Sequence, residues 1–179
     1  MKRQLLQFII ILSLATLCTA QAWGQTATTI TPTQPAAGDG SSGNPYQIGN
    51  VAELYWFAGL VNGTLPDGPS KNVAACARLT ADITLNENVL DEKGDLNTAD
   101  KVSFAEWMPI GLDQYTGTFD GQGFTIKGMY INGGENYTSG NVGLFGNINK
   151  GEVKNLFLTD GYILINNKNN TNIPVGGIK

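Results

Sequence analysis

The sequence predicts a mainly β protein, namely a right-handed parallel β-helix (β-solenoid) with one short capping helix near its N-terminal end. Three observations lead to this fold class. The second half of the chain contains an internal repeat, and the hydrophobic alternation changes phase inside that repeat. Glycine also supplies 23 of the 179 residues. This content is well above the usual ~7% and suits a chain that turns after every few residues.

The internal repeat has a constant interval. Val153 follows Ile126 by 27 residues, and Leu158 follows Ile131 by the same interval. One repeat of a solenoid usually takes about 20 to 45 residues. The interval therefore fits one coil of a solenoid.

The phase change indicates a corner inside each copy of the repeat. Phe124 and Ile126 share one alternation phase, whereas Met129 has the opposite one. Side chains on an unbroken strand alternate without slipping, so the chain must bend at Gly128. Asn155 takes the same place in the second copy, and both residue types tolerate left-handed backbone angles. We therefore expect Gly128 and Asn155 to be structural corners on successive rungs.

A helix is predicted over residues 51–61. Asn50 followed by Glu53 forms a capping-box pattern, and apolar residues then recur at helical spacing until Gly63 ends the segment. A single helix ahead of a β region can cover the open end of a sheet stack and its unpaired strand edges. We expect it to serve as that cap.

The remaining segments follow from composition and turn residues. Residues 23–45 are rich in Thr, Pro, Gly and Ser, which predicts a flexible linker. The β-solenoid then occupies residues 46–179 and is expected to be incomplete at its C-terminal end. Short strands are predicted at residues 46–48, 77–85, 104–110 and 117–119, with an acidic loop at 86–102.

The first 22 residues have the layout of a secretory signal peptide. Lys2 and Arg3 precede an apolar run of about a dozen residues, which ends before Ala20-Gln21-Ala22. The run is shorter than the ~20 residues that a membrane-spanning helix needs. Cleavage after Ala22 predicts a secreted or cell-surface protein with no transmembrane segment, although Cys18 leaves lipidation open as an alternative.

Charge and residue content exclude several classes of function. The chain has 15 acidic and 11 basic residues, which argues against nucleic acid and anionic membranes as partners. The chain contains no histidine, so Ser-His-Asp and Cys-His nucleophile systems and imidazole zinc sites are excluded. Cys76 is the one cysteine left after cleavage, and its alanine neighbours favour a buried small hydrophobe.

Two acidic features admit both a chemical and a structural interpretation. Asp120 lies in Phe-Asp-Gly-Gln-Gly, where a tight turn stabilised by the aspartate is favoured over a catalytic carboxylate, because no partner carboxylate is evident. An oxygen-rich loop offers calcium as a possible ligand, but its spacing does not match an EF-hand. No other cofactor is expected. The residues of this loop are Asp91, Asp95, Asn97 and Asp100.

Aromatic residues provide the candidate contacts to a sugar. Trp107, Tyr115 and Tyr137 can offer ring faces, with Asp113 as a hydrogen-bonding neighbour. The alternative is that these rings are buried in the core. No catalytic site is predicted.

Several segments together carry a family resemblance. They are residues 79–85, 107–111, 117–126, 142–146 and 153–156. In these segments the chain resembles bacterial surface proteins with GLUG motifs and the β-solenoid regions of IgA-protease-like and filamentous-haemagglutinin-like exported proteins. Phe124 stands where members of that family often have histidine.

The resemblance implies a parallel β-helix used for adhesion, display or contact with a glycan or host surface protein. We expect a scaffold or adhesin module without catalysis of its own. The alternative is the N-terminal solenoid of a larger exported peptidase or glycan-cleaving enzyme. The end of the sequence at Lys179 indicates a fragment, a truncated gene or an edge covered by a partner, and self-association of the open end is a further option.

Overall fold

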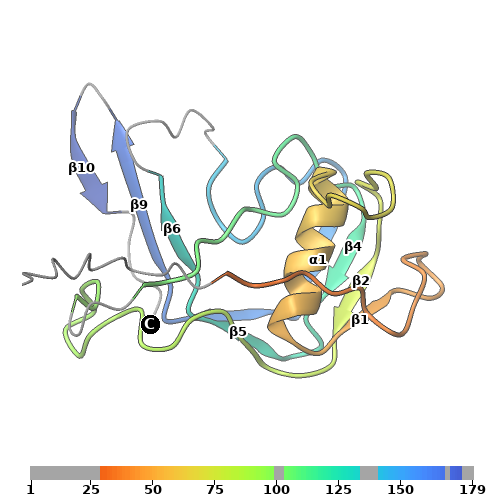
Figure 1. Ribbon diagram of the computed structural model, residues 1–179, viewed down its shortest axis with the longest axis horizontal. Coiled ribbons are helices and arrows are strands. Elements are labelled where there is room, and N and C mark those ends of the chain that lie inside the picture. The colour runs from red at the N-terminus through yellow and green to blue at the C-terminus, as the bar shows by residue number, and fades with distance from the viewer. Residues whose placement is uncertain (1–28, 99–102, 134–140, 168–169, 175–179) are drawn as a thin grey trace, which may run out of the picture.

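A computed structural model describes residues 29–98, 103–133, 141–167 and 170–174. It consists mainly of short strands in parallel sheets, with one helix, as the sequence predicts (Figure 1). The elements are β1 (Tyr46–Ile48), α1 (Val51–Asn62), β2 (Ala77–Leu79), β3 (Ile83–Thr84), β4 (Thr118–Asp120), β5 (Thr125–Lys127), β6 (Tyr130–Asn132), β7 (Glu152–Lys154), β8 (Phe157–Thr159), β9 (Tyr162–Asn167) and β10 (Asn170–Pro174).

The strands form three sheets, and the last two passes of the chain visit all three in the same order. The first sheet has the order β1-β2-β4-β7, and every pair in it is parallel. The second sheet, β3-β5-β8, is also parallel. In the third sheet β6 pairs with β9 in parallel, and β10 adds an antiparallel strand. Consecutive strands such as β4, β5 and β6 thus belong to different sheets, and the next pass pairs with all three.

The core lies between the sheets. In β4, β5 and β6 the central residue points inward, whereas in β1 and β2 the two outer residues do so and the central residue points outward. Phe119, Ile126 and Ile131 are the central residues of β4, β5 and β6, and each is at most 1% exposed. Their neighbours on either side point outward and are polar in most cases. Three-residue strands therefore suffice to bury one large apolar side chain each.

The bend predicted inside the repeat is confirmed, but the predicted alignment of its two copies is wrong. Gly128 has a φ of 77° between β5 and β6, and Asn155 has a φ of 52° between β7 and β8. Val153 pairs with Phe119 rather than with Ile126. Both copies are short strands with the same alternation, so an alignment shifted by one strand fits the hydrophobic pattern equally well.

The two predicted corner residues consequently belong to different corners. The carbonyl group of Asn155 accepts a hydrogen bond from the Gly123 amide at 2.8 Å, which places Asn155 beside the turn that follows β4. The Gly128 amide donates instead to the Thr159 carbonyl at 3.0 Å. The residue that follows Thr159 is Asp160, whose φ is 53°. Asp160, rather than Asn155, therefore occupies the corner next to Gly128.

The helix forms where the sequence predicts it and ends one residue later, at Asn62. The Asn50 side chain accepts a hydrogen bond from the Glu53 amide at 3.0 Å, and the Glu53 carboxylate accepts one from the Gly49 amide at 2.7 Å. Gly63 ends the helix with a φ of 73°, in the left-handed region. Local capping residues therefore determine both ends of α1.

The position of the helix differs from the predicted cap. The Phe57 ring lies 6.5 Å from the Tyr46 ring on β1 and 5.8 Å from the Phe119 ring on β4, measured between centroids. The helix thus packs across the inner face of the first sheet, in front of β1, β2 and β4 (Figure 1). Its residues 54 and 56–61 are all buried. A helix that is buried on so many sides has to lie inside the fold rather than at one edge.

The segment predicted as a linker has fixed structure over part of its length. The Gln47 amide of β1 donates to the Ala37 carbonyl at 3.0 Å, and the Cys76 amide donates to the Gly40 carbonyl at 2.8 Å. Pro35 and Gly40 are buried. The backbone N–H of Gln47 points away from β2. Residues 37–44 therefore cover the outer edge of β1. The capping of an unpaired strand edge, which the sequence analysis assigns to the helix, is thus performed by residues 37–44.

Two predicted strands also differ from the structure. Residues 77–85 bend at Thr80 and form β2 and β3, which belong to different sheets. Residues 104–110 form no strand beyond a single parallel bridge between Ile110 and Phe145. This segment lies between α1 and residues 142–148, so its burial comes from packing rather than from a strand ladder.

Candidate functional site: a polar groove on the outer face of the first sheet

The outer face of the first sheet carries a row of polar side chains. The strand register places Gln47 beside Arg78, Arg78 beside Asp120, and Asp120 beside Lys154. A second row contains Thr118 next to Glu152. Alternation along each strand turns these side chains outward while their apolar neighbours face the core. We call this surface, with the loop described next, the sheet groove.

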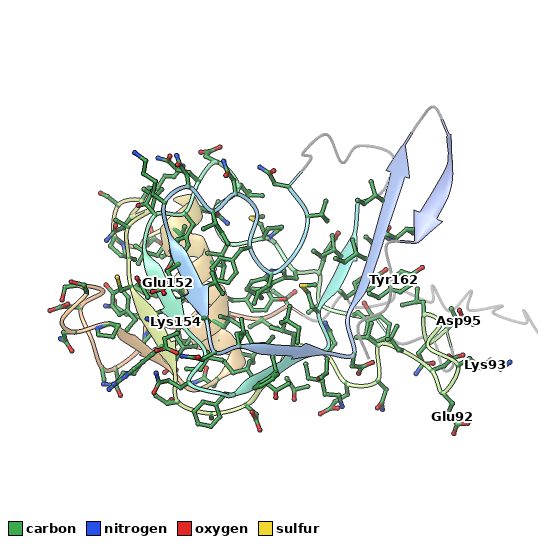
Figure 2. All side chains as sticks on the ribbon, turned by 180° about the vertical axis from the view of Figure 1, so that it is seen from behind. Glu92, Lys93, Asp95, Glu152, Lys154 and Tyr162 are labelled. Atoms are coloured by element: carbon green, nitrogen blue, oxygen red, sulfur yellow. The ribbon has the colours of Figure 1, made fainter. Side chains whose placement is uncertain are left out.

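The sheet groove has a volume of about 450 Å³. Its floor comes from β2, β4 and β7, and one wall comes from the loop that precedes β1. Figure 2 shows Glu152 and Lys154 together on β7. The lining residues are Ser42, Gly43, Pro45, Cys76, Ala77, Arg78, Thr118, Asp120, Gln122, Glu152 and Lys154.

The wall of the groove is fixed by its own hydrogen bonds. The Asp39 carboxylate accepts a hydrogen bond from the Ser41 amide at 2.9 Å. Hydrogen bonds from Ser41 lower the pKa of Asp39, so this carboxylate stays ionised and keeps the turn closed. The Asn44 amide donates to the Ser41 hydroxyl oxygen at 3.1 Å, which closes the loop from the other side.

Asp120 is the most constrained charge in the groove. Its carboxylate accepts hydrogen bonds from the Gln122 amide and from the Asn155 side-chain amide, both at 3.0 Å. The Gln122 backbone bond is the largest cause that lowers the pKa of Asp120, followed by the Asn155 bond and the nearby Lys154 charge. The favoured interpretation of Asp120 as a turn-stabilising residue is therefore confirmed. An ionised, hydrogen-bonded carboxylate of this kind is an acceptor, not a proton donor.

The two cations of the groove differ in their partners. The Lys154 ammonium lies 3.0 Å from the Glu152 carboxylate, and this hydrogen bond raises the pKa of Lys154. Arg78 makes no ion pair with any residue in the described ranges. Its guanidinium is exposed and presents donors that suit a carboxylate or the hydroxyl groups of a sugar.

The structure does not bring the predicted sugar-contacting residues together. Trp107 is 2% exposed and donates through Nε1 to the Leu144 carbonyl at 3.2 Å. Tyr115 is fully buried, and its hydroxyl donates to the Ala75 carbonyl at 3.0 Å. Neither ring has a face open to a ligand, so as sugar platforms these two predictions are wrong. Asp113 is exposed and forms an ion pair with Lys71, whereas Tyr137 lies outside the described residues.

The acidic loop contains a hydrogen-bonded turn. The Asp91 carboxylate accepts hydrogen bonds from the Lys93 and Asp95 amides, both at 2.9 Å, which makes a closed turn of the acidic loop. Asp100 lies outside the described residues. Within the part of the chain that the structure describes, no three His, Cys, Asp or Glu side chains gather so that they could hold a metal ion. Cys76 is buried, as predicted.

Sequence reasoning singled out Asp120 and Cys76 but missed the sheet groove to which they belong and its other residues. Arg78 and Glu152 are far apart in the chain, and only the register of β2, β4 and β7 brings them to one surface. The available signal was local: Ala77-Arg78-Leu79 has a charged residue between two apolar ones, as expected for a strand with one exposed face. A second missed feature is the row Phe104, Tyr130 and Tyr162, where the two tyrosine rings stack with centroids 6.3 Å apart.

Comparison with known proteins gives one related sequence. The chain is 34% identical over 134 residues to a protein of Evansella cellulosilytica named "Putative Gly-rich membrane protein". The match covers 73% of this chain and 13% of the relative, so the chain spans only a small part of that protein. No family model and no solved structure matches the chain. Within the described ranges, no helix combines the length and apolar character needed to cross a bilayer.

Proposed function

We propose that the chain is a secreted or cell-surface β-solenoid module whose sheet groove contacts a glycan or a host surface protein, without catalysis of its own. The observation that carries this proposal is the sheet groove itself. It combines a fixed ionised acceptor, Asp120, with an exposed donor, Arg78, that has no ion-pair partner in the described ranges. Rigid polar groups on a scaffold are suited to hydroxyl-rich ligands.

The β-solenoid class is supported by the order of the strands. The last two passes of the chain place their strands in the same three sheets, and corresponding strands pair in parallel. Parallel strands in one sheet are joined by right-handed connections in nearly all known proteins, which supports the right-handed form.

Location in the cell envelope is supported by two observations. The first 22 residues have the pattern of a secretory signal, and the related protein is named a membrane protein. These observations are compatible with export and display at the surface.

The alternative function is a module of a larger exported peptidase or glycan-cleaving enzyme. The favouring observation is that the chain spans 13% of its relative, which leaves room for other domains in a protein of that kind. In such a protein the sheet groove would position a substrate for a catalytic site elsewhere.

A glycan array with purified protein tests the proposed function. We expect binding to a subset of glycans, loss of that binding in Arg78→Ala and Asp120→Asn, and unchanged binding in Lys127→Ala. Lys127 is a suitable control because it is partly exposed, pairs with Glu87 and does not line the groove. Equal binding by Arg78→Ala and the unmodified protein would exclude the groove as the contact site. Cleavage of a glycan by the purified chain would contradict a non-catalytic module.

A further inference from the structure

The first sheet ends at β7, and this strand has one free edge. The Glu152 amide donates to the Gly117 carbonyl at 2.9 Å, and the Lys154 carbonyl accepts from the Gly121 amide at 2.8 Å. In a parallel ladder alternate residues face the same neighbour. The N–H and C=O of Val153 therefore point away from β4, and no strand among the described residues pairs with them.

Apolar side chains are exposed at the same end of the stack. A cavity of about 350 Å³ opens between Leu144, Phe145, Val153, Leu156 and Leu158. Phe157, at the start of β8, is 60% exposed, but it pairs with Thr125 and points outward like that residue. The cavity itself opens into the core, because one pass earlier the inward side chains at the register positions of Val153 and Leu158 are covered.

The strand register shows which inward-facing residues of the last pass lack a covering layer. Val153 pairs with Phe119, and Leu158 pairs with Ile126. Phe119 and Ile126 are both fully buried, whereas Val153 and Leu158 are only partly covered. Coverage by one more layer would give Val153 and Leu158 the environment that Phe119 and Ile126 already have.

The sequence of β7 is complementary to itself in an antiparallel pair. Centred on Val153, such a pair sets Glu152 opposite the partner's Lys154 and Lys154 opposite the partner's Glu152. It also turns both valines toward the core side and lets the two Val153 backbones exchange two hydrogen bonds. We propose that a second copy of this chain covers the open end, through antiparallel pairing of β7 with the partner's β7 about a twofold axis.

The opposite end of the first sheet is not available for the same contact. The outer edge of β1 is already covered, since the Gln47 amide donates to the Ala37 carbonyl. A head-to-tail contact would need that edge to be free. Because the β1 edge of the first sheet is covered, pairing through β7 is symmetric and gives an isologous dimer.

Pairing would also extend the sheet groove. Lys154 lies at the β7 end of the row of outward polar side chains, and the partner's Glu152 would continue that row into the second copy. The 3.0 Å pair between Lys154 and Glu152 within one chain is exposed, so exchanging it for pairs between copies costs little. The inference rests on the strand register and does not depend on which ligand the groove binds.

Charge exchange at β7 tests the dimer by sedimentation equilibrium of the purified protein. The unmodified protein is expected to be a dimer at micromolar concentrations. Glu152→Lys and Lys154→Glu each place like charges opposite one another, which should weaken the dimer at least about tenfold. An equimolar mixture of the two variants should form a heterodimer, and the double variant Glu152→Lys, Lys154→Glu should dimerise as the unmodified protein does.

The matched control is the exposed pair Lys127 and Glu87, with the same separation of 3.0 Å. Glu87→Lys and Lys127→Glu should leave the dimer unchanged. The proposal is overturned if the unmodified protein is monomeric up to about 100 µM, because the dissociation constant would then lie well above the expected micromolar range. It is equally overturned if either single β7 variant dimerises normally, or if mixing the two β7 variants does not restore association.

Discussion

The backbone of Gly128 lies directly against the backbone of Asn86. A β-carbon on Gly128 would collide with the Asn86 carbonyl oxygen, and Gly128 has a φ of 77°. The Asn86 side chain donates to the Gly128 carbonyl at 2.8 Å and forms a pair of hydrogen bonds with the backbone of Ala105. This contact joins two passes of the chain at one corner, so the corner requires glycine for two independent reasons.

Gly128→Ala is expected to destabilise the fold strongly. The substitution adds the cost of a left-handed backbone, about 1–2 kcal/mol, to that of displacing a backbone segment, so we expect a loss of at least ~2 kcal/mol. Urea unfolding followed by circular dichroism measures the change in the free energy of unfolding.

Two other glycines separate these contributions. Gly123 has a φ of 83° but nothing near its virtual β-carbon, so Gly123→Ala should cost only about 1–2 kcal/mol. Gly43 has open space and no positive φ, so Gly43→Ala should be close to neutral. A ranking in which Gly128→Ala is no worse than Gly123→Ala would show that the corner can relax away from Asn86.

Asp160 fixes the start of the acidic loop. Its carboxylate accepts hydrogen bonds from the Leu90 amide at 2.8 Å and the Val89 amide at 3.3 Å. Asp160→Ala should cost about 1.5–3 kcal/mol, because it removes bonds to a charged acceptor. Hydrogen exchange at Val89 and Leu90 should accelerate, while exchange at Ile126 follows global unfolding only. Unchanged exchange at Val89 and Leu90 would mean that the loop is held by other contacts.

Local signals in the sequence predict the local features of this fold. Asn50, Glu53 and Gly63 determine the ends of the helix through hydrogen bonds within a few residues, and Gly128 reveals its corner through the phase change. The alignment of the two repeat copies fails because strands of three residues contain too little information to determine register. The pairing of Val153 with Phe119 depends on how the whole pass stacks, which no short window records.

The sheet groove could not be predicted for the same reason. Arg78, Asp120 and Lys154 come from three different passes and meet only through register. The predicted aromatic site fails on a different point: Trp107 and Tyr115 are rings that the sequence cannot assign to surface or core. Their buried polar atoms find backbone partners, as such atoms do in a core.

Tyr115→Phe distinguishes a core role from a role in ligand binding. It leaves the Ala75 carbonyl without its buried donor, which should cost about 1–3 kcal/mol of stability. Glycan binding by the folded variant should be unchanged, because Tyr115 does not reach the sheet groove. Thermal unfolding and a glycan titration on the same sample measure both effects. If Tyr115→Phe lost glycan binding without losing stability, Tyr115 would be a ligand contact rather than a core residue.

The carboxylate of Asp120 should remain ionised at pH values where an ordinary aspartate is half protonated. Its pKa is lowered from the ordinary 3.8, first by the Gln122 backbone bond and then by the Asn155 side chain. A folded pKa below the unfolded one stabilises the fold fully above pH 3.8, and this stabilisation is lost as pH falls through the lower folded value.

Carbon-13 NMR titration of the Asp120 carboxyl should therefore show a midpoint below 3.8, and Asn155→Ala should move that midpoint upward. Unfolding free energies of the unmodified protein and Asp120→Asn should converge at acid pH. A midpoint at or above 3.8 would mean that the turn does not hold the charge, and Asp120 would then lose its role as the fixed acceptor of the groove.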